Sequence, residues 1–316
     1  NTIYSIIRTG DNQIYVGTYN GLCRYIASNG KFEKIPLPVN SSQSNLFVNS
    51  LLEDTGRQCI WIGTEGYLFQ YFPSTGQMKQ TEAFHNNSIK SLALDGNGYL
   101  LAGTDNGLYV YHNDVTPLQH IIHDSRNIQS LTNNIIWNIF ADQEHNIWLG
   151  TDYGISLSRY NSALQFIPIS QITGTGDGNQ FYSLFRDSKG FYWFGGTNGL
   201  IRFTDPAGDK HNAIWYRMGD KTYPLSHNRI RHIYEDKEQQ IATDGSINRY
   251  DYATRQFVHY NIVDSTGTYN TNWTYYMFED NAGHLWISTC LGGIFVVDKH
   301  RLMQSASGQY VAEQNY

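Results

Sequence analysis

Short apolar segments of strand length recur along the whole chain in a fixed order. The first segment of each group, such as NIIWNIFAD or WTYYMFED, ends at an acidic residue in most copies. A second segment of the type Ile-Trp-x-Gly-Thr follows, then a run of alternating type such as GLYVYH, and finally a weaker run such as QFVHYNI. Alternating apolar positions bounded by turn residues predict β-strands, because successive side chains of a strand point to opposite faces. The pattern therefore predicts groups of four strands joined by tight turns.

The second segment carries a motif that recurs seven times. It reads IYVGTYNGL in the first copy and IWLGTDYGI in the fourth. The intervals between successive threonines are 46, 40, 47, 46, 46 and 46 residues, and a period in the forties built from short β-rich units is typical of propeller blades. The repeats, numbered one to seven, are centred on Thr18, Thr64, Thr104, Thr151, Thr197, Thr243 and Thr289.

This periodicity predicts an all-β fold: residues 1–316 form a single domain, a seven-bladed β-propeller of four-stranded antiparallel blades. The final residues, QYVAEQNY, are expected to include the outer strand of repeat seven. Repeats six and seven depart from the motif at Ala242 and Ser288, which leaves the strand edges there open. The motif tryptophans are predicted to lie in the core, namely Trp61, Trp148, Trp193 and Trp286.

The composition excludes several kinds of partner and site. The formal net charge is −6 at pH 7 and no run of Lys or Arg is present, so a polyanionic nucleic acid is not expected as a partner. Three cysteines without Cys-x-x-Cys spacing indicate neither a disulfide framework nor a zinc site. No apolar stretch reaches the roughly 18 residues that span a bilayer, so membrane contact by this fragment is not expected. No cofactor and no metal are predicted.

One column of the innermost strands differs from the others. Counted back from the acidic residue that ends each strand, the sixth and third positions are apolar in most copies and the fourth is small or polar, as blade packing requires. The fifth position varies and is rich in aromatic and cationic side chains, which is how a binding surface would look. It is occupied by Tyr4, Asn49, Lys90, Trp137, Tyr182, Arg231 and Tyr275.

The turn between the second and third strands should lie at the same end of a blade as the start of the innermost strand. Together they form a rim that offers aromatic rings for the apolar faces of sugars and fixed polar groups for their hydroxyls. The alternative is that the aromatics only fill the central channel and that Asn and Asp only satisfy turn geometry. The ligand-binding residues predicted on this rim are Tyr4, Lys90, Trp137, Tyr182, Arg231, Tyr275, Tyr19, Asp105, Asp152, Tyr153, Arg229 and Trp273.

The asparagines that precede the innermost strands lie near the same rim. Because the same residue type recurs from repeat to repeat, we interpret them as caps of nearby backbone groups rather than as ligand contacts. They are Asn87, Asn134, Asn179, Asn228 and Asn272.

Catalysis would require a pair of carboxylates at a defined separation, or a tyrosine or histidine base with a cationic partner. Three aspartates, Asp105, Asp152 and Asp244, could converge on one rim. An acid/base group could be formed by His227, His232, Tyr276 and Arg231. Acidic turn residues are expected in most propellers, however. We therefore predict no catalytic residues and no enzyme activity in this fragment.

The Trp-x-Gly-Thr-x-x-Gly-Leu cores and the preceding Ser-Leu-x-x-Asp pattern, as at Ser50 to Asp54 and Ser183 to Asp187, resemble the two-component regulator propeller repeats. Such repeats occur in the periplasmic sensor regions of Bacteroides-type hybrid two-component histidine kinases. The resemblance covers essentially the whole chain. It implies a periplasmic ligand-sensing module that recognises an oligosaccharide and signals to control polysaccharide utilisation.

The resemblance also implies partners. In that family, neighbouring propeller and immunoglobulin-like domains lie in the same chain, and the full-length receptor is expected to form a homodimer. Kinase motifs are absent from the sequence, so phosphotransfer would belong to the rest of the parent chain. The alternative function is a protein–protein interaction or dimerisation scaffold, which an apolar rim would favour. A propeller glycosidase or polysaccharide lyase is the third possibility.

Overall fold

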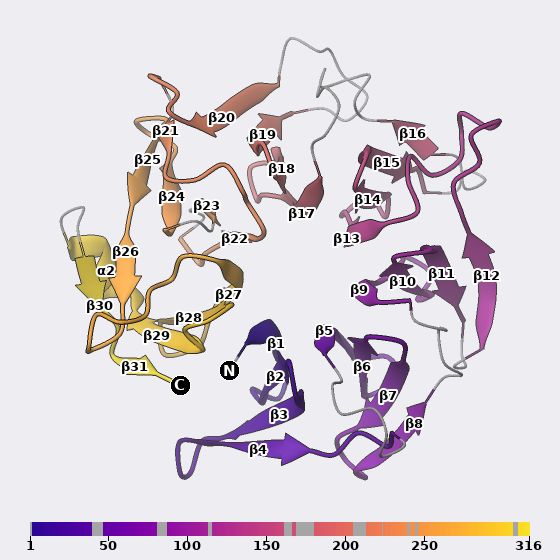
Figure 1. The fold of residues 1–316 in the computed structure, drawn as a ribbon, viewed down its shortest axis with the longest axis horizontal. Coiled ribbons are helices and arrows are strands. Elements are labelled where there is room, and N and C mark those ends of the chain that lie inside the picture. The colour runs from indigo at the N-terminus through magenta and orange to yellow at the C-terminus, as the bar shows by residue number, and fades with distance from the viewer. Residues whose placement is uncertain are drawn as a thin grey trace. The chain divides into compact units, whose positions relative to one another are not determined.

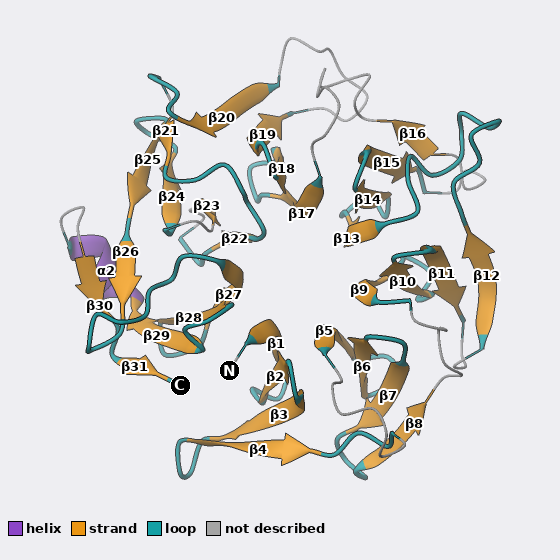
Figure 2. Cartoon of the chain, in the orientation of Figure 1, coloured by secondary structure: helices purple, strands orange, loops and turns teal. Residues whose placement is uncertain are grey.

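The computed structural model describes residues 2–39, 47–80, 87–112, 116–160, 166–168, 180–204, 213–222, 224–238, 241–243, 246–305 and 309–316. Its secondary structure is almost entirely β (Figures 1 and 2). The chain divides into two compact units: Tyr4–Ser170 is the N-terminal unit, and Gln171–Tyr316 together with Asn1–Ile3 is the C-terminal unit.

The N-terminal unit contains four sheets of four strands, one for each of repeats one to four. Consecutive sheets pack with their innermost strands as neighbours. In chain order the sheets are β1 (Ile3–Arg8), β2 (Ile14–Thr18), β3 (Gly21–Ile26) and β4 (Lys31–Ile35); β5 (Val48–Asp54), β6 (Cys59–Thr64), β7 (Leu68–Phe72) and β8 (Gln77–Gln80); β9 (Ile89–Leu94), β10 (Leu100–Thr104), β11 (Gly107–Tyr111) and β12 (Pro117–Ile121); and β13 (Ile136–Ala141), β14 (Ile147–Thr151), β15 (Gly154–Ser158) and β16 (Phe166–Pro168).

The C-terminal unit departs from this form. Its sheets are β17 (Phe181–Arg186), β18 (Tyr192–Gly196), β19 (Gly199–Phe203), β20 (Ile214–Met218) and β21 (Pro224–Leu225); β22 (Ile233–Glu235), β23 (Ile241–Thr243), β24 (Asn248–Asp251) and β25 (Gln256–His259); β27 (Thr274–Glu279), β28 (His284–Thr289), β29 (Ile294–Asp298) and β31 (Gln314–Asn315); and a pair, β26 (Asn261–Val263) with β30 (Gln309–Val311).

The prediction of seven four-stranded antiparallel blades is therefore wrong. In the described part of the chain, six blades have four strands, and the sheet of repeat five has five. Its extra strand follows a bend at Gly219, where φ is +81°, after which β21 pairs parallel to β20. The all-β propeller class itself holds.

Repeat seven is completed in an unexpected way. After β29 the chain forms a short helix, α2 (Lys299–Gln304), and then β30 pairs parallel to β26. Only then does β31 return to pair with β29, so the expectation that the last residues supply the outer strand is confirmed. A helix of six residues is too short to leave an amphipathic pattern in the sequence.

Lys299 anchors this insertion in the C-terminal unit. Its side chain is buried, and its ammonium group lies 2.7 Å from Glu279 Oε2 and also contacts Glu238. Burial alone would lower the pKa of Lys299, but hydrogen bonds to Glu238 and Glu279 outweigh it and raise the pKa. The buried charge is thus paired, as a stable interior requires.

The motif threonine closes the turn between the second and third strands. Thr104 Oγ1 donates to Gly107 O at 2.9 Å and accepts from the Asn106 amide at 2.9 Å. Thr151 makes the same pair of bonds with Gly154 and Tyr153. Gly107 has φ +93°, a conformation that residues with a Cβ rarely adopt. The Gly-Thr-x-x-Gly motif is therefore a turn signature.

The motif tryptophans are buried, with exposed fractions of 5 % or less, which confirms the prediction. Each indole N–H donates to the acidic residue that ends the innermost strand, for example Trp148 to Asp142 Oδ2 at 2.9 Å. The same carboxylate accepts the Asn146 amide at 2.8 Å and so holds the turn that joins the first two strands. The other pairs are Trp61 with Asp54, Trp193 with Asp187 and Trp286 with Asp280.

The motif glycine sets the spacing between neighbouring sheets. A Cβ placed on Gly103 would lie 2.7 Å from Ile136 Cγ2 of the next sheet, and one on Gly63 would lie 2.6 Å from Ile89 Cγ2. At Gly17, Gly63 and Gly103, the apolar residue that begins the next innermost strand therefore packs directly on the glycine of the preceding sheet. This contact explains why the motif glycine and the apolar residue that begins the innermost strand change little between repeats.

We expect Gly103→Ala to lower the free energy of unfolding by about 1–3 kcal/mol, because the new methyl group must displace Ile136 in a packed core. Gly10→Ala is the matched control, since the nearest atom to its Cβ, Glu53 Oε1, lies 3.7 Å away. Urea unfolding of both variants measures the difference. Equal stability of the two would contradict this account of the motif glycine.

We expect Asp142→Ala to lower the free energy of unfolding by about 1–3 kcal/mol, because it leaves the buried indole N–H of Trp148 without its acceptor. Asp95→Ala is the control: Asp95 holds the equivalent turn through the Asn97 and Tyr99 amides, but repeat three has Leu101 in place of the tryptophan. Chemical denaturation should show the smaller loss for Asp95→Ala. The reverse order would show that the indole bond contributes little.

Candidate ligand-binding rim

In five repeats the variable column of the innermost strands coincides with a β-bulge, whereas Arg231 lies just before β22. In repeat four, Ile136 pairs with Thr151 and Asn138 pairs with Gly150, so the register of the ladder skips Trp137. Register shifts at the same place leave out Asn49 in β5, Lys90 in β9, Tyr182 in β17 and Tyr275 in β27. A bulged residue is released from ladder and packing constraints and its side chain is redirected. The structure thereby gives the reason why this column varies.

The N-terminal unit gathers many of the predicted residues at one end of its sheets. This N-terminal rim consists of Tyr4, Tyr19, Phe47, Asn49, Glu65, Ser88, Lys90, Asp105, Trp137, Asp152 and Tyr153. The pairing confirms that this turn and the start of the innermost strand lie at the same end of a sheet. In repeats two, three and four the threonine that ends the second strand pairs with the first residue of the innermost strand, as Thr104 does with Ile89.

Lys90 stands at the centre of the N-terminal rim. Its ammonium group lies 2.9 Å from Asp105 Oδ1 and 4.2 Å from the centre of the Trp137 ring. Trp137 in turn donates its indole N–H to Asp152. Two bulged residues and two turn carboxylates from neighbouring sheets therefore form one connected group, with the Lys90 side chain 16 % exposed and that of Asp105 38 % exposed.

Sequence reasoning missed part of this network. Ser88 Oγ donates to Glu65 Oε1 at 2.9 Å and accepts from Asn49 Nδ2 at 2.9 Å, while its amide donates to Asp105. Phe47 also lies on the rim, with its ring centre 4.3 Å from that of Tyr19 and 6.0 Å from that of Tyr4. Both Phe47 and Ser88 directly precede an innermost strand, a position that the column comparison did not consider.

The C-terminal unit has its own group, the C-terminal rim, formed by Gln180, Tyr182, Arg229, Arg231, Trp273, Tyr275 and Leu291. The Arg231 guanidinium lies 5.5 Å from the Trp273 ring centre and 5.7 Å from that of Tyr275. Tyr182 donates its hydroxyl to Gln180 at 2.5 Å. Arg229 is exposed, and its backbone amide donates to His227 Nδ1.

Trp273 is the most unusual residue of the C-terminal rim. It is 51 % exposed, and its φ of +67° is a left-handed conformation that is rare for bulky side chains. Its carbonyl accepts the Cys290 amide, which places it beside the turn that carries Leu291, itself 72 % exposed. Backbone strain that presents a large aromatic side chain to solvent is the kind of feature that clusters at ligand-binding positions.

Two of the asparagines that precede the innermost strands, Asn134 and Asn228, cap backbone as predicted, whereas the Asn272 side chain accepts the Ser246 hydroxyl instead. Asn134 Oδ1 accepts the His123 amide at 2.6 Å, and Asn228 Oδ1 accepts the Met218 amide at 2.7 Å. Their carbonyls accept the amides of Gly107 and Gly199. Asn179 lies outside the described residues.

Comparison with known proteins agrees with the repeat fold. The two component regulator propeller family matches residues 130–153 and 175–198. The sequence is 91% identical over its whole length to the solved extracellular domain of BT4673 from B. thetaiotaomicron, with a TM-score of 0.50. The chain carries two-component regulator propeller repeats. The resemblance expected from the motifs is therefore confirmed.

BT4673 has been described as a one component system and, in a second structure at 92% identity, as a hybrid two component system. The chain spans 43% of the length of that solved domain, which therefore extends beyond the matching part. It thus corresponds to part of the extracellular domain of a sensor system, and the predicted location outside the cytoplasm is confirmed.

More distant likeness shows the fold alone. The extracellular domain of BT3049 from B. thetaiotaomicron superimposes with a TM-score of 0.74 at 21% identity, covering 93% of this chain and 38% of that one. None of the curated proteins compared matches the sequence.

The acid/base group considered from the sequence is not arranged for proton transfer on the rim. Burial lowers the pKa of His232 to about 4, and its Nε2 donates to the Met277 carbonyl. Its ring packs 4.2 Å from that of Tyr276, whose pKa is raised by burial. Near neutral pH, the histidine is thus uncharged and the tyrosine protonated.

The carboxylates of the N-terminal rim are already engaged by Lys90, Ser88 and Trp137. The described residues contain no group of three or more His, Cys, Asp or Glu side chains that could hold a metal ion. Within the same residues, no helix has the length and apolar character needed to cross a membrane.

A double-mutant cycle tests whether Lys90 and Trp137 act as a unit. We expect Lys90→Ala and Trp137→Ala to be coupled by about 0.5–1 kcal/mol in urea unfolding, because the ammonium group sits over a partly desolvated ring. The control cycle is Lys79 with Phe72, where the distance from the ammonium group to the ring centre is 5.6 Å. Coupling no larger than in the control would contradict a connected rim.

Proposed function

We propose that this chain is the ligand-sensing propeller module of a hybrid two-component sensor, that it binds an oligosaccharide at its rim residues, and that this binding controls polysaccharide utilisation. The observation that carries the proposal is the bulged column. The repeat positions that pack between sheets keep the same kind of residue, because the fold requires it. The bulged positions lie at the end of the sheets and carry different aromatic and charged side chains.

The chemistry of the two rims supports a sugar ligand. Trp273, Tyr153 and Tyr19 expose 51 %, 63 % and 42 % of their surfaces, and flat rings of this kind stack on the apolar faces of pyranoses. Carboxylate, ammonium, guanidinium and amide groups lie beside them and can bond sugar hydroxyls. Many of these polar groups are held by one another, so the surface is preorganised.

Signalling would follow from differential affinity. A ligand shifts the arrangement of the neighbouring domains only if it binds one arrangement more tightly than the other. We propose that the rest of the parent chain supplies further propeller and immunoglobulin-like domains and the kinase, and that the receptor works as a homodimer. In this scheme the chain itself senses and does not catalyse.

Calorimetric titration of the chain with plant, host and microbial oligosaccharides tests the proposal. We expect saturable binding of one class without turnover, weakened at least about tenfold by Trp273→Asn or by Arg231→Ala if the C-terminal rim holds the sugar. Asparagine is chosen because it tolerates the left-handed backbone of residue 273. Trp137→Ala reports in the same way on the N-terminal rim.

Trp215→Ala is the matched control. Trp215 also lies beside a guanidinium, that of Arg217 at 4.4 Å from its ring centre, but it is on β20, away from the bulged column. It should leave sugar binding unchanged. Binding that survives every rim variant, or that is lost in the control alone, would refute the assignment, and release of a product would indicate an enzyme.

A docking scaffold is the second candidate, and Leu291 favours it. This aliphatic side chain is 72 % exposed next to Trp273, so that part of the C-terminal rim is apolar as well as polar. A scaffold would predict that Leu291→Ser weakens assembly of the longer receptor while sugar titrations of the chain stay silent. Sedimentation of the receptor with and without the substitution distinguishes the two functions.

A further inference from the structure

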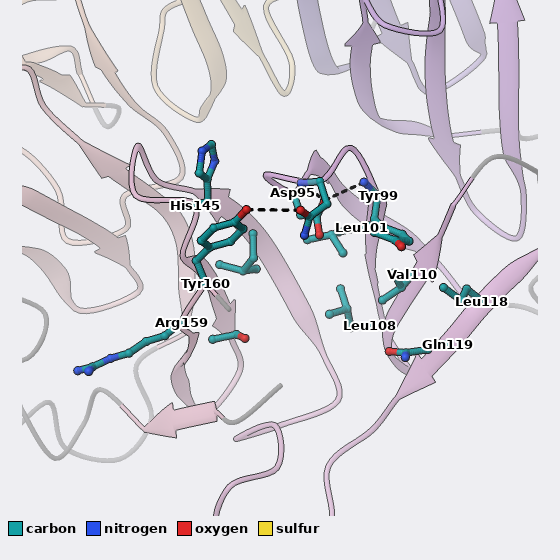
Figure 3. Close-up of a pocket in the computed structure, with 13 residues that line it drawn as sticks. Asp95, Tyr99, Leu101, Leu108, Val110, Leu118, Gln119, His145, Arg159 and Tyr160 are labelled. Atoms are coloured by element: carbon teal, nitrogen blue, oxygen red, sulfur yellow. Dashed lines mark hydrogen bonds between the residues drawn. The ribbon is translucent and has the colours of Figure 1, made fainter. Parts of the chain in front are cut away.

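A cavity of about 300 Å³ lies between the sheets of repeats three and four in the N-terminal unit (Figure 3). The turn that joins β9 to β10 borders it, whereas the rim turns join β10 to β11, so the cavity and the N-terminal rim lie at opposite ends of β10. Its walls include Asp95, Leu101, Val110, Ile147, Ser158 and Tyr160. None of these residues belongs to either rim.

The cavity exists because two large aromatic side chains are missing from this interface. Between repeats two and three, Trp61 and Tyr111 fill the corresponding space and are almost completely buried in one apolar cluster. Leu101 occupies the motif position of Trp61. Ser158 occupies the position of Tyr111, since Tyr111 pairs with Leu100 and Ser158 pairs with Ile147, the matching residue of the next sheet. Both replacements remove a ring.

The same replacement leaves a hydrogen-bond acceptor without its donor. In repeats two and four, Oδ2 of the buried aspartate accepts an indole N–H, from Trp61 and Trp148 respectively. Asp95 uses Oδ1 for the turn amides of Asn97 and Tyr99. Among the residues that the structure describes, none donates to Asp95 Oδ2, and this residue lines the cavity. The cavity and an acceptor atom that these residues leave unused, Asp95 Oδ2, therefore lie at the same place.

Two aromatic residues of repeat four form the mouth. The Tyr160 ring is turned toward Asp95 across the cavity, and its hydroxyl lies 3.5 Å from Asn97 Oδ1 (Figure 3). The rings of Tyr160 and His145 are 5.1 Å apart. His145 has φ +62°, and a Cβ on Gly96 would lie 2.5 Å from its ring, so only glycine at residue 96 leaves room for the imidazole. Tyr160 is 40 % exposed, so the mouth can be reached from solvent.

We propose that this cavity is a second binding site, for a small planar aromatic molecule that carries an N–H or O–H donor, of the indole or phenol class. The apolar walls bury the ring, as they bury Trp61 between the preceding pair of sheets. The donor of the ligand bonds Asp95 Oδ2 and replaces the missing indole N–H. The site is independent of the proposed sugar-binding rims and would respond to a different class of compound.

Indole itself is the probe. We expect saturable binding of indole to the 316-residue chain in isothermal titration calorimetry and a rise in its melting temperature. 1-Methylindole, which has the same ring without the N–H donor, should bind at least about tenfold more weakly, which corresponds to one hydrogen bond to a charged acceptor. Indole and 1-methylindole bound equally well would overturn the role of Asp95.

Two substitutions fill the cavity from opposite sides. Leu101→Trp restores the motif tryptophan and Ser158→Tyr restores the tyrosine found at residue 111, and each should abolish indole binding while leaving rim binding of oligosaccharide unchanged. If one of them fails to fold, the other still decides. Undiminished indole binding in the folded variant would place the ligand elsewhere and refute the proposal, as would failure of the unsubstituted chain to bind indole at millimolar concentration.

Asp95→Asn tests the acceptor without changing the shape of the cavity. Asparagine keeps an oxygen for the Asn97 and Tyr99 amides but presents an NH₂ group where Oδ2 stood, so indole should bind at least about tenfold more weakly and 1-methylindole should be unaffected. Equal loss for both ligands would show that the substitution had disturbed the cavity rather than removed the acceptor.

Discussion

A buried carboxylate at the end of the innermost strand is the interaction on which four of the repeats depend. Asp54, Asp142 and Asp187 are each no more than 5 % exposed, and a buried charge is tolerated only when hydrogen bonds replace its lost hydration. One oxygen holds the turn to the next strand and the other accepts the motif indole, so a single side chain fixes both the turn and the core ring. Burial opposes ionisation of Asp54, but the bonds from Trp61 and Arg57 outweigh it, and its pKa lies below the usual value.

The bulge separates what the fold needs from what a ligand could use. Positions on either side of the bulge pack against the neighbouring sheet, as Ile136 does on Gly103, and cannot change without cost. The register of the ladder skips the bulged residue itself. Lys90, Trp137 and Tyr275 can therefore differ between repeats while the scaffold stays the same. The same repetition makes exceptions informative: Leu101 in place of a tryptophan leaves a cavity and an acceptor without its donor.

Much of this arrangement was predictable because it is local in sequence. The strand groups, the Gly-Thr-x-x-Gly turns and the burial of the motif tryptophans follow from patterns within about ten residues of one another. The variable column also emerged from comparing repeats, although its cause did not. A bulge is a shift in register between two strands, which no single strand encodes. The roles of the rim residues in ligand binding remain predictions.

The errors and omissions arose where pairing joins distant segments. The insertion of α2 and β30 before β31 and the contacts of Phe47 and Ser88 on the rim depend on residues that meet only after folding. The parallel strand β21 is an exception, because Pro224 pairs with the nearby Arg217. The sequence by itself determined the all-β repeat and its turns, because these rest on short-range backbone preferences and on the alternation of side chains. Only the tertiary structure decided the number of strands in each sheet, which rim side chains touch, and where a cavity opens, because these depend on contacts between repeats some forty residues apart.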